Sequence, residues 1–590
     1  MTNIPRPEYP RPQFLRDQWI NLNGTWTCEF DHSRSGYDAG EMLKGGEQKR
    51  SRRLWQSTGF DQEITVPFCP ESELSGIGHT DFIEQMWYHR KLEIPAEWTD
   101  GILLHFGAVD YHCDVFIDGK LVGRHAGGQV GFNFDVSSFV TPGSSHDLVL
   151  LVRDDVRGYV QPSGKQSSAH HSHGCHYTRV TGIWQTVWME PVSRFAIDEV
   201  QVIADLDKSA FHLIPTFHGI VPGGRLQVQL LDDEAVVAEA DTVQAPGIPV
   251  TLTIPDPKTW SPDSPHLYDI ELTVIDADGN CLDAVKSYAG LRKIHIDGDR
   301  VYLNNTPLYQ RLVLDQGYYP DGIWTAPNDE ALKRDIELAM AAGFNGARLH
   351  QKVFEPRFHY WADTLGYLTW GEASSWGCNA ASFEGRDNFL REWREILLRD
   401  RNHPSIITWT PWNEMWWIQN EEQFGRTLNE TYELTRSLDP TRPVHTASGG
   451  AHCKTDIWSV HSYEQNGTDL VRVAGAKQDA NLERSQKYLG DARPHAGQPL
   501  LLDEFGGIKW QPITHGETDW GYGDAPKTLD EFYARLDELV AATLALPGYV
   551  GYCYTQLTDV EQEVNGIYNY DRTPKFDMER IRAIFIKEST

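Results

Sequence analysis

The C-terminal half of the chain alternates between strand-like and helix-like patterns from about residue 295 onward. Amphipathic helical patterns lie at 329–343, 388–400, 421–438 and 528–546. Eight apolar segments are predicted as strands: 308–314, 344–350, 367–373, 406–412, 443–448, 457–463, 499–505 and 549–555. This order and length predict a (β/α)8 TIM barrel over 295–590. A doubly wound sheet also alternates, but the region lacks an early glycine-rich phosphate-binding fingerprint.

The chain before residue 295 reads as strands alone and divides into two segments. Residues 1–192 contain short alternating runs, and Asp118-Gly119 is a two-residue hairpin signal between two of them. This pattern predicts a jelly roll. Residues 193–294 are smaller and predict an immunoglobulin-like sandwich, with the proline-rich stretch 255–266 as a surface loop. The fold class is therefore multidomain β plus α/β.

Charge and composition narrow the partners of this chain of 590 residues. With 53 Lys and Arg against 84 Asp and Glu, the formal net charge is −31, which disfavours nucleic acid and anionic membranes. The N-terminal residues show no signal-peptide pattern, and no stretch approaches the ~20 apolar residues of a membrane span. The eight cysteines form no C-x-x-C pair, so we expect reduced thiols and a cytoplasmic location.

Two glutamates stand at the ends of predicted barrel strands. Glu414 follows the fourth strand in TWTPWNEMWW, and Glu504 ends the seventh in PLLLDEFGG. Catalytic groups of TIM barrels occupy the C-terminal strand ends. Retaining glycosidases need two carboxyls about 5–5.5 Å apart, one as proton donor and one as nucleophile. Either glutamate alone is equally consistent with a rim ion pair, but the two together predict such an enzyme.

The chain resembles glycoside hydrolase family 2, the group of β-galactosidases, β-glucuronidases and β-mannosidases, over nearly its whole length. The first segment carries WYHRKLEIP, FGAVDYHCDVFIDGKLVGRHAGG and TGIWQTVWME, and GLRKI leads into the barrel. The barrel carries FNGARLH, GYLTWGEA, RNHPSIITWTPWNE and LLDEFG. The tail TQLTDVEQEVNGIYNYDRTPK is similar to the closing segment of the family.

The resemblance implies a role for each matching residue. Glu414 matches the acid/base, Glu504 the nucleophile and Asn413 the donor to the sugar 2-hydroxyl. Tyr463 and Arg348 match residues that contact the nucleophile and would keep its pKa low. Further substrate-binding residues are expected at Asp315, His350, Glu372, Tyr554, Trp412 and His176. No cofactor is implied.

The acid Glu414 needs a raised pKa, which burial among Trp412, Trp416 and Trp417 would provide. Each of these tryptophans is equally consistent with plain core packing. We therefore expect a raised pKa for Glu414, without assigning the cause to one ring.

Several positions depart from the known branches of the family. Glu563-Val564-Asn565 stands where β-glucuronidases carry an Asn-x-Lys pair for the sugar carboxylate, and an acid with an amide suits a carboxylate poorly. Glu372-Ala373-Ser374 lacks the histidine of the magnesium pair in β-galactosidases, so no metal is expected. Asp315 is interpreted either as a ligand for two sugar hydroxyls or as a loop cap. His176 stands where many members of the family carry an acidic residue.

The histidine-rich run 170–176 allows two interpretations. A zinc site is one, but the spacing fits no usual finger. A loop that reaches the active-site mouth, where histidines hydrogen-bond sugar hydroxyls, is the favoured one.

The sequence thus predicts an exo-glycosidase for a small carbohydrate substrate, with a β-galactoside as the first expectation. An α-L-arabinoside, a β-galacturonide or a β-glucuronide remain alternatives. A non-catalytic carbohydrate-binding protein would lack one of the glutamates, and a transglycosylase would use the same residues. The resemblance also implies a homo-oligomer, a dimer or tetramer.

Overall fold

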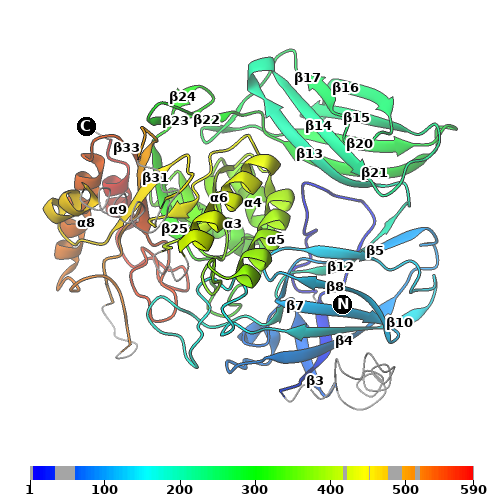
Figure 1. Cartoon of the computed structure of the whole chain (residues 1–590), viewed down its shortest axis with the longest axis horizontal. Helices are drawn as coiled ribbons and strands as arrows, with labels where there is room; N and C mark the ends of the chain where they lie inside the picture. Colours follow the sequence, from blue (N-terminus) through cyan, green and yellow to red (C-terminus); the bar gives the residue numbers. More distant parts are fainter. Residues whose placement is uncertain are drawn as a thin grey trace.

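The computed structural model describes residues 4–32, 60–415, 421–450, 452–475, 495–511 and 518–588. Two β-rich parts lie beside a barrel that carries the helices (Figure 1). The first two parts correspond to the predicted jelly roll and immunoglobulin-like sandwich, and the third to the predicted TIM barrel. No helix in the described ranges has the length and apolar character that a bilayer crossing requires.

The jelly roll packs a four-stranded antiparallel sheet against a six-stranded one around an apolar core. The predicted hairpin is confirmed, because Asp118 (φ +46°) and Gly119 (φ +83°) join β7 and β8 with the left-handed backbone that such turns need. The strand order of the four-stranded sheet is β1 (Ile20–Asn21), β12 (Val187–Val192), β5 (Gly101–Phe106) and β9 (Phe132–Asp135). The strand order of the six-stranded sheet is β3 (Gln62–Val66), β2 (Gly24–Phe30), β4 (Gln85–Glu93), β10 (Ser145–Arg153), β7 (His112–Ile117) and β8 (Lys120–Ala126).

The second sandwich sets three strands against four, and alternating apolar residues of both sheets form its core. Its strands are β13 (Ile197–Asp205), β14 (Ala210–Phe217) and β17 (Val250–Thr253), facing β16 (Ala235–Val243), β15 (Arg225–Asp232), β20 (Tyr268–Ile275) and β21 (Cys281–Ala289).

One residue of the proline-rich stretch 255–266 is not on the surface, contrary to the prediction of a surface loop. Trp260 is fully buried, and its indole N–H donates to the carbonyl oxygen of Asp363 at 2.7 Å. It belongs to the same apolar cluster as Leu312 and Leu368, which lie on two barrel strands. The second sandwich therefore fills the lower end of the barrel with one of its own side chains.

The barrel has seven parallel strands in one curled sheet and a short fifth strand between the sheet's two ends. The sheet order is β28 (Ile406–Thr410), β27 (Leu368–Glu372), β26 (Gly346–Leu349), β25 (Gln310–Asp315), β33 (Tyr549–Thr555), β32 (Leu500–Gly506) and β31 (Trp458–Ser462). The predicted strand 443–448 is regular only at β30 (Ala447–Ser448), which pairs with β29 (Trp412–Asn413). On its other side, the His445 ring contacts Ser459 of β31 at 2.7 Å.

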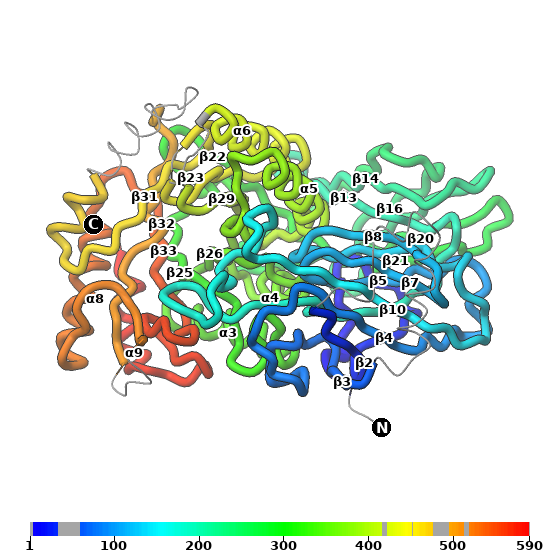
Figure 2. The backbone as a smooth tube through the Cα atoms, turned by 60° about the horizontal axis from the view of Figure 1, so that its bottom comes forward, coloured from blue at the N-terminus to red at the C-terminus, as the bar shows by residue number. Residues whose placement is uncertain are grey.

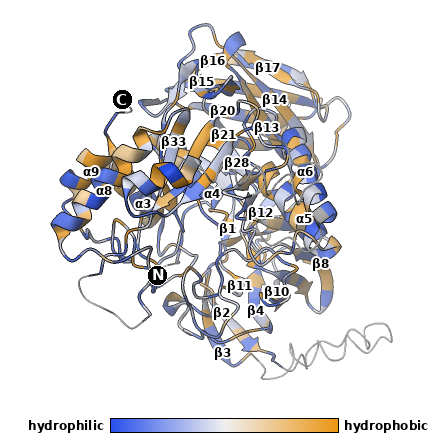
Figure 3. Cartoon of the chain, turned by 60° about the vertical axis from the view of Figure 1, so that its left-hand side comes forward, coloured by the Kyte–Doolittle hydropathy of each residue, from blue (hydrophilic) through white to orange (hydrophobic). Residues whose placement is uncertain are grey.

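The helices surround this sheet and have apolar faces toward it. Figure 3 shows α8 and α9 with both hydrophobic and hydrophilic positions, as expected for helices half-covered by a core. The predicted helices correspond to α3 (Asp329–Ala341), α5 (Phe383–Asp400), α6 (Glu421–Leu438) and α8 (Leu529–Leu544). Two more were not predicted, α4 (Pro356–Leu365) and α9 (Met578–Phe585). The short α4 begins with a proline and ends at Gly366 in a left-handed conformation.

A long connection of the jelly roll, residues 154–181, crosses to the barrel mouth. Figure 2 shows this cyan segment beside the barrel strands. Its backbone is attached there, since Ser163 N–H donates to Trp376 O at 2.8 Å and Gly164 N–H to Ser374 O at 3.2 Å. Gly164 has φ +59°, and a Cβ atom would lie 2.1 Å from the carbonyl oxygen of Gln351. Only glycine permits this close approach.

Candidate active site

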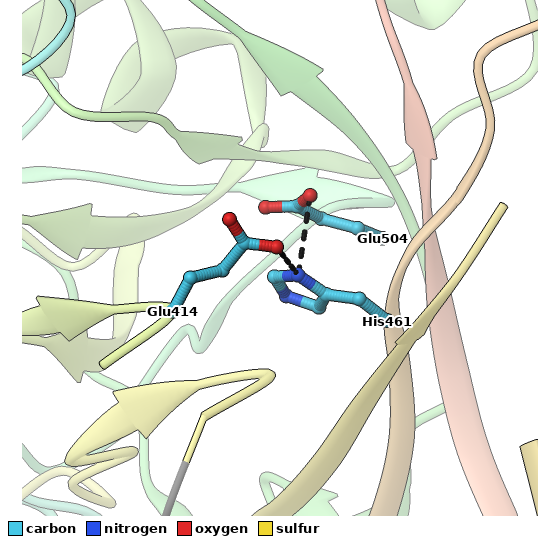
Figure 4. Close-up of side chains that lie close together, drawn as sticks. All are labelled: Glu414, His461 and Glu504. Carbon is cyan, nitrogen blue, oxygen red and sulfur yellow. Dashed lines mark hydrogen bonds and ion pairs between the residues drawn. The ribbon is translucent and has the colours of Figure 1, made fainter. Parts of the chain in front are cut away.

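The two predicted catalytic glutamates meet at the C-terminal end of the barrel. Glu504 lies on β32, and Glu414 follows β29 directly. One carboxylate oxygen of Glu414 lies within 4.8 Å of one of Glu504 (Figure 4). Glu414 has φ +46°, a strained value for a side chain with a Cβ, and its N–H donates to Ser448 O at 2.8 Å. Such strain concentrates at functional positions.

Glu504 has a donor on each carboxylate oxygen. Arg348 Nη1 donates to Oε1 at 2.9 Å, and the Tyr463 hydroxyl donates to Oε2 at 2.5 Å. Tyr463 in turn stacks on Tyr522 with the ring centroids 3.4 Å apart. The structure therefore brings Arg348 and Tyr463 to the positions expected from the sequence, and both hold Glu504 in one orientation.

Arg348 is fully buried and connects several expected residues. It donates to Glu372 through Nε at 2.5 Å and to Asn413 Oδ1 through Nη2 at 2.6 Å. Glu372 also lies 2.7 Å from His350 Nδ1. Burial raises the pKa of Glu372 and lowers that of His350 well below its ordinary value. Glu372, expected to bind substrate, instead lies beneath the site and supports Arg348.

Asn413 keeps one group for a ligand. Its Oδ1 accepts from Arg348, whereas its buried Nδ2 has no hydrogen-bond partner among the described residues. A buried amide donor without an acceptor is costly unless a ligand or water supplies one. The free Nδ2 of Asn413 therefore suits the role that the resemblance implies for this residue, as a hydrogen-bond donor to a sugar hydroxyl.

His461 is a central residue of the site that the sequence analysis did not identify. Its Nδ1 lies 2.7 Å from Glu414 Oε1 and 3.3 Å from Glu504 Oε2 (Figure 4). Its Nε2 lies 2.9 Å from Ser448 Oγ and 3.4 Å from Asp503 Oδ1. Burial alone would lower the pKa of His461, but Glu504, Asp503 and the hydrogen bond to Glu414 raise it to about 10. His461 is therefore an imidazolium between the two carboxylates.

The pKa of Glu414 differs from the expectation. Burial would raise it, but the hydrogen bond and charge of His461 outweigh burial, so that the pKa of Glu414 is lowered. The raised pKa predicted from the tryptophans is therefore wrong. Trp412 packs in the helix layer, stacked on Phe389 at 3.7 Å, and does not face the glutamates. Trp416 and Trp417 lie outside the described residues.

Tyr554 also points away from the expected sugar pocket. Tyr554 packs between Phe505 and Phe585, with ring centroids 5.5 and 5.1 Å away, on the helix side of the sheet. Its neighbour Thr555 faces the site, where its hydroxyl lies 3.0 Å from that of Tyr463. Because successive strand residues face opposite sides, an assignment one position off reverses the side chain.

Asp315 likewise faces the helix layer. Leu312 and Leu314 of β25 point into the barrel, so Asp315 points outward, as Val313 does. Asp315 accepts a hydrogen bond from Gly317 N–H at 2.9 Å, and burial raises its pKa to about 7. Of its two interpretations, the hydrogen bond from Gly317 N–H and the outward direction of the side chain favour the loop cap.

The connection 154–181 contributes residues to the mouth of the site. His176 lies against Trp376, with ring centroids 5.4 Å apart, and burial lowers its pKa to about 4. The indole N–H of Trp376 donates to Asn413 O at 3.2 Å. The Tyr177 hydroxyl donates to Glu563 at 2.5 Å. The histidine-bearing loop therefore reaches the active-site mouth, as favoured from the sequence.

One cluster of possible metal ligands lies at the active site itself. Within the described ranges, the one group of three or more His, Cys, Asp and Glu ligand atoms close together is Glu414, His461 and Glu504. These three residues are the two glutamates and the histidine between them, so this group belongs to the active site already described. The histidines of 170–176 form no such group in the same ranges.

Comparisons with known proteins agree with this architecture along the chain. A model described as "Glycosyl hydrolases family 2, sugar binding domain" matches residues 21–189. A second, "Glycosyl hydrolases family 2", matches residues 198–292. A third, "Glycosyl hydrolases family 2, TIM barrel domain", matches residues 325–587.

Individual relatives share between 20% and 24% sequence identity with this chain. A β-galactosidase of Photobacterium profundum is 22% identical over 96% of this chain, which spans 56% of that protein's length. A β-glucuronidase of Paenibacillus borealis is 24% identical over 82% of both chains. The structure of a β-D-glucuronidase of Dictyoglomus thermophilum superposes with a TM-score of 0.77 at 20% identity and covers 98% of both chains, which shows the shared fold. The chain belongs to glycoside hydrolase family 2.

Proposed function

We propose that the protein is a retaining exo-glycosidase that removes a terminal β-linked sugar by double displacement. The observation that carries the proposal is the pair Glu414 and Glu504, whose nearest oxygens lie within 4.8 Å. Inverting enzymes keep their carboxyls roughly 6.5–9.5 Å apart to admit a water molecule, whereas retaining enzymes keep them about 5–5.5 Å apart.

In the first step, Glu504 attacks the anomeric carbon. Arg348 and Tyr463 hold its two oxygens in place. The bond between the anomeric carbon and the leaving oxygen breaks, and that oxygen takes up, through Glu414, the proton that Glu414 shares with His461. The sugar is then linked covalently to Glu504 in the α configuration. The free Nδ2 of Asn413 donates to the sugar 2-hydroxyl.

The proton for this step belongs to the Glu414–His461 pair. The hydrogen bond between them is 2.7 Å long, and the raised pKa of His461 keeps one proton on the pair well above neutral pH. Interacting groups of this kind titrate together, so the pair supplies the acid function although the pKa of Glu414 itself is lowered.

In the second step, Glu414 acts as base. It removes a proton from a water molecule, whose oxygen attacks the anomeric carbon while the bond to Glu504 breaks. Two inversions at one carbon give net retention. Exo action is supported by the connection 154–181, because it brings His176 and Tyr177 against barrel residues at the mouth.

The alternative of a non-catalytic carbohydrate-binding protein has no specific support. Both glutamates are present, and each has the hydrogen-bond partners that catalysis requires. A cytoplasmic location stays part of the proposal and is supported by eight cysteines that form no disulfide. A homo-oligomer remains a prediction.

Rescue by azide tests the proposal. We expect Glu504→Ala to lose activity on aryl β-glycosides by roughly 10⁴-fold or more. Added azide should restore turnover and yield an α-glycosyl azide. Glu414→Ala with azide should yield the β-glycosyl azide from a substrate with a good leaving group. NMR of the products distinguishes the two, and near wild-type turnover by Glu504→Ala would refute the proposal.

A further inference from the structure

Lys165 is a buried cation at the active-site mouth that the mechanism above does not use. It lies in the connection 154–181, one residue after the glycine that fits against Gln351 O. The residue is only 6% exposed. Its Nζ lies 5.8 Å from the ring centroids of both Tyr177 and Trp376. Two aromatic rings and the attached loop backbone therefore hold the ammonium group in place.

No protein acceptor holds this ammonium within the described ranges. Lys165 Nζ makes no hydrogen bond there and lies within 4.0 Å of no described carboxylate. A lysine ammonium has three donors, and a buried charge without a partner is costly. The group is not sealed in either, because Lys165 is absent from the fully enclosed polar atoms that lack a partner.

The acids on which the charge of Lys165 acts already accept other hydrogen bonds. The two carboxylate oxygens of Glu563 accept hydrogen bonds from Tyr177 at 2.5 Å and Asn565 at 2.9 Å. Glu414 is bonded to His461. Burial raises the pKa of Glu563, and the charge of Lys165 opposes that rise. Burial lowers the pKa of His350, and the charge of Lys165 lowers it further. The ammonium therefore lies beside Trp376, whose indole N–H donates to the carbonyl oxygen of Asn413, the residue before Glu414.

We propose that Lys165 binds the carboxylate of the substrate's terminal sugar and that the natural substrate is a hexuronide. This rests on the proposed function and deepens it. A uronic acid has its carboxylate on carbon 5 of the sugar, so the charge enters the pocket together with the anomeric carbon. A carboxylate gives the buried ammonium a charged acceptor, and such hydrogen bonds are about twice as strong as neutral ones.

Lys165 would supply the cation that is missing from the closing segment of the chain. The segment Glu563-Val564-Asn565 lacks the lysine expected of a uronate site, and a β-glucuronide was disfavoured for that reason. In the structure, Asn565 and Tyr177 engage Glu563, and the cation comes instead from a different domain. A single lysine suits one carboxylate. A phosphate dianion usually recruits arginines or several cations.

Kinetics on matched substrates test the proposal. The substrates are p-nitrophenyl β-D-galacturonide and β-D-glucuronide, with the neutral galactoside and glucoside as partners. We expect the wild type to prefer a uronide. Lys165→Met should lower kcat/KM on that uronide roughly 100-fold and change the neutral partner by less than about threefold. Lys165→Arg, which keeps the charge, should retain most of the uronide activity.

Lys293→Met serves as the control for the loss of one positive charge. Lys293 pairs with Asp207 at the surface, at 2.6 Å. This variant should leave all four substrates unchanged. Thermal unfolding of each variant shows whether it folds.

Binding provides a readout without turnover. Calorimetry on Glu504→Gln should show affinity for D-galacturonate or D-glucuronate and weaker affinity for D-galactose and D-glucose. Adding Lys165→Met should remove the uronate preference. The proposal is overturned if the wild type prefers a neutral or 6-sulfated sugar, if Lys165→Met affects neutral and uronic substrates alike, or if uronate binding is unchanged. The azide experiment tests the proposed function independently of the sugar, so the two failures are distinguishable.

Discussion

The barrel and the connection 154–181 contribute to the same mouth in different ways. The barrel residues are hydrogen-bonded directly to one another. Arg348, for example, donates hydrogen bonds to Glu372, Glu504 and Asn413. The connection is attached to the barrel through its backbone at Ser163 and Gly164, and its His176 packs on Trp376 at the mouth. The comparison suggests that the barrel carries out bond cleavage and the connection selects the sugar.

The largest effect should follow from breaking the barrel network at its centre. Arg348→Met would leave Glu372 and Glu504 without their buried cation. Loss of one partner of a buried ion pair costs about 3–5 kcal/mol, and loss of an electrostatic donor at the reacting group costs roughly 10²–10³ in rate. Urea unfolding and kcat/KM on neutral and uronic glycosides measure both. A loss confined to one sugar would contradict the division between barrel and connection.

His461→Asn tests whether the acid proton is shared. The pKa of His461 is raised from 6.5 to about 10 in the folded protein. Its stabilising contribution is therefore fully present below pH 6.5 and is lost as the pH rises through about 10. We expect the alkaline limb of kcat/KM to shift downward by about two pH units or more in the variant, because Glu414 must then hold the proton alone.

The control for this variant is its pH dependence of stability. Urea unfolding should show the wild type losing its advantage over His461→Asn between pH 6.5 and 10. An unchanged alkaline limb would show that His461 does not share the proton with Glu414.

A pair of tyrosines separates residues that face the site from those that do not. Tyr463→Phe removes a hydrogen bond to the ionised nucleophile and should lower kcat/KM roughly 10- to 100-fold. Tyr554→Phe should change it by less than about twofold, because that ring lies on the helix side. Steady-state kinetics on one aryl glycoside suffice. Equal losses for the two variants would mean that Tyr554 also reaches the substrate.

The smallest effect concerns the attachment of the connection. Gly164→Ala would place a Cβ atom 2.1 Å from Gln351 O and displace Lys165 slightly. We expect about a tenfold loss of kcat/KM on uronides and little change on neutral glycosides. Gly174→Ala is the matched control, since its φ of +53° imposes similar strain but nothing lies within 4 Å. Similar kinetics for both variants would show that the position of the connection does not matter.

The sequence predicted the parts of this protein that depend on local pattern. The strands and most helices followed from apolar periodicity, and Glu414, Glu504, Asn413, Arg348 and Tyr463 lie in short motifs at strand ends. Helix α4 was missed because only ten residues, opened by a proline, give little periodic signal.

Side-chain direction and contacts between domains could not be predicted in the same way. Trp412, Asp315 and Tyr554 sit on predicted strands, but a shift of one residue turns each to the other face. His461 lies two positions before Tyr463, on the same face of its strand, so alternation from that tyrosine is the signal that would have found it. No sequence pattern pointed to Lys165, because its neighbour Trp376 lies in a distant part of the chain.

The buried Trp260 has a consequence for how such a chain can be divided or recombined. Its ring belongs to the second sandwich in sequence and to the base of the barrel in space. A barrel separated from that sandwich would lack the Trp260 indole. The cavity left in its base would destabilise the barrel by about 3–5 kcal/mol. Gene rearrangements that exchange the barrel alone are therefore disfavoured, because the barrel is stable only together with the second sandwich.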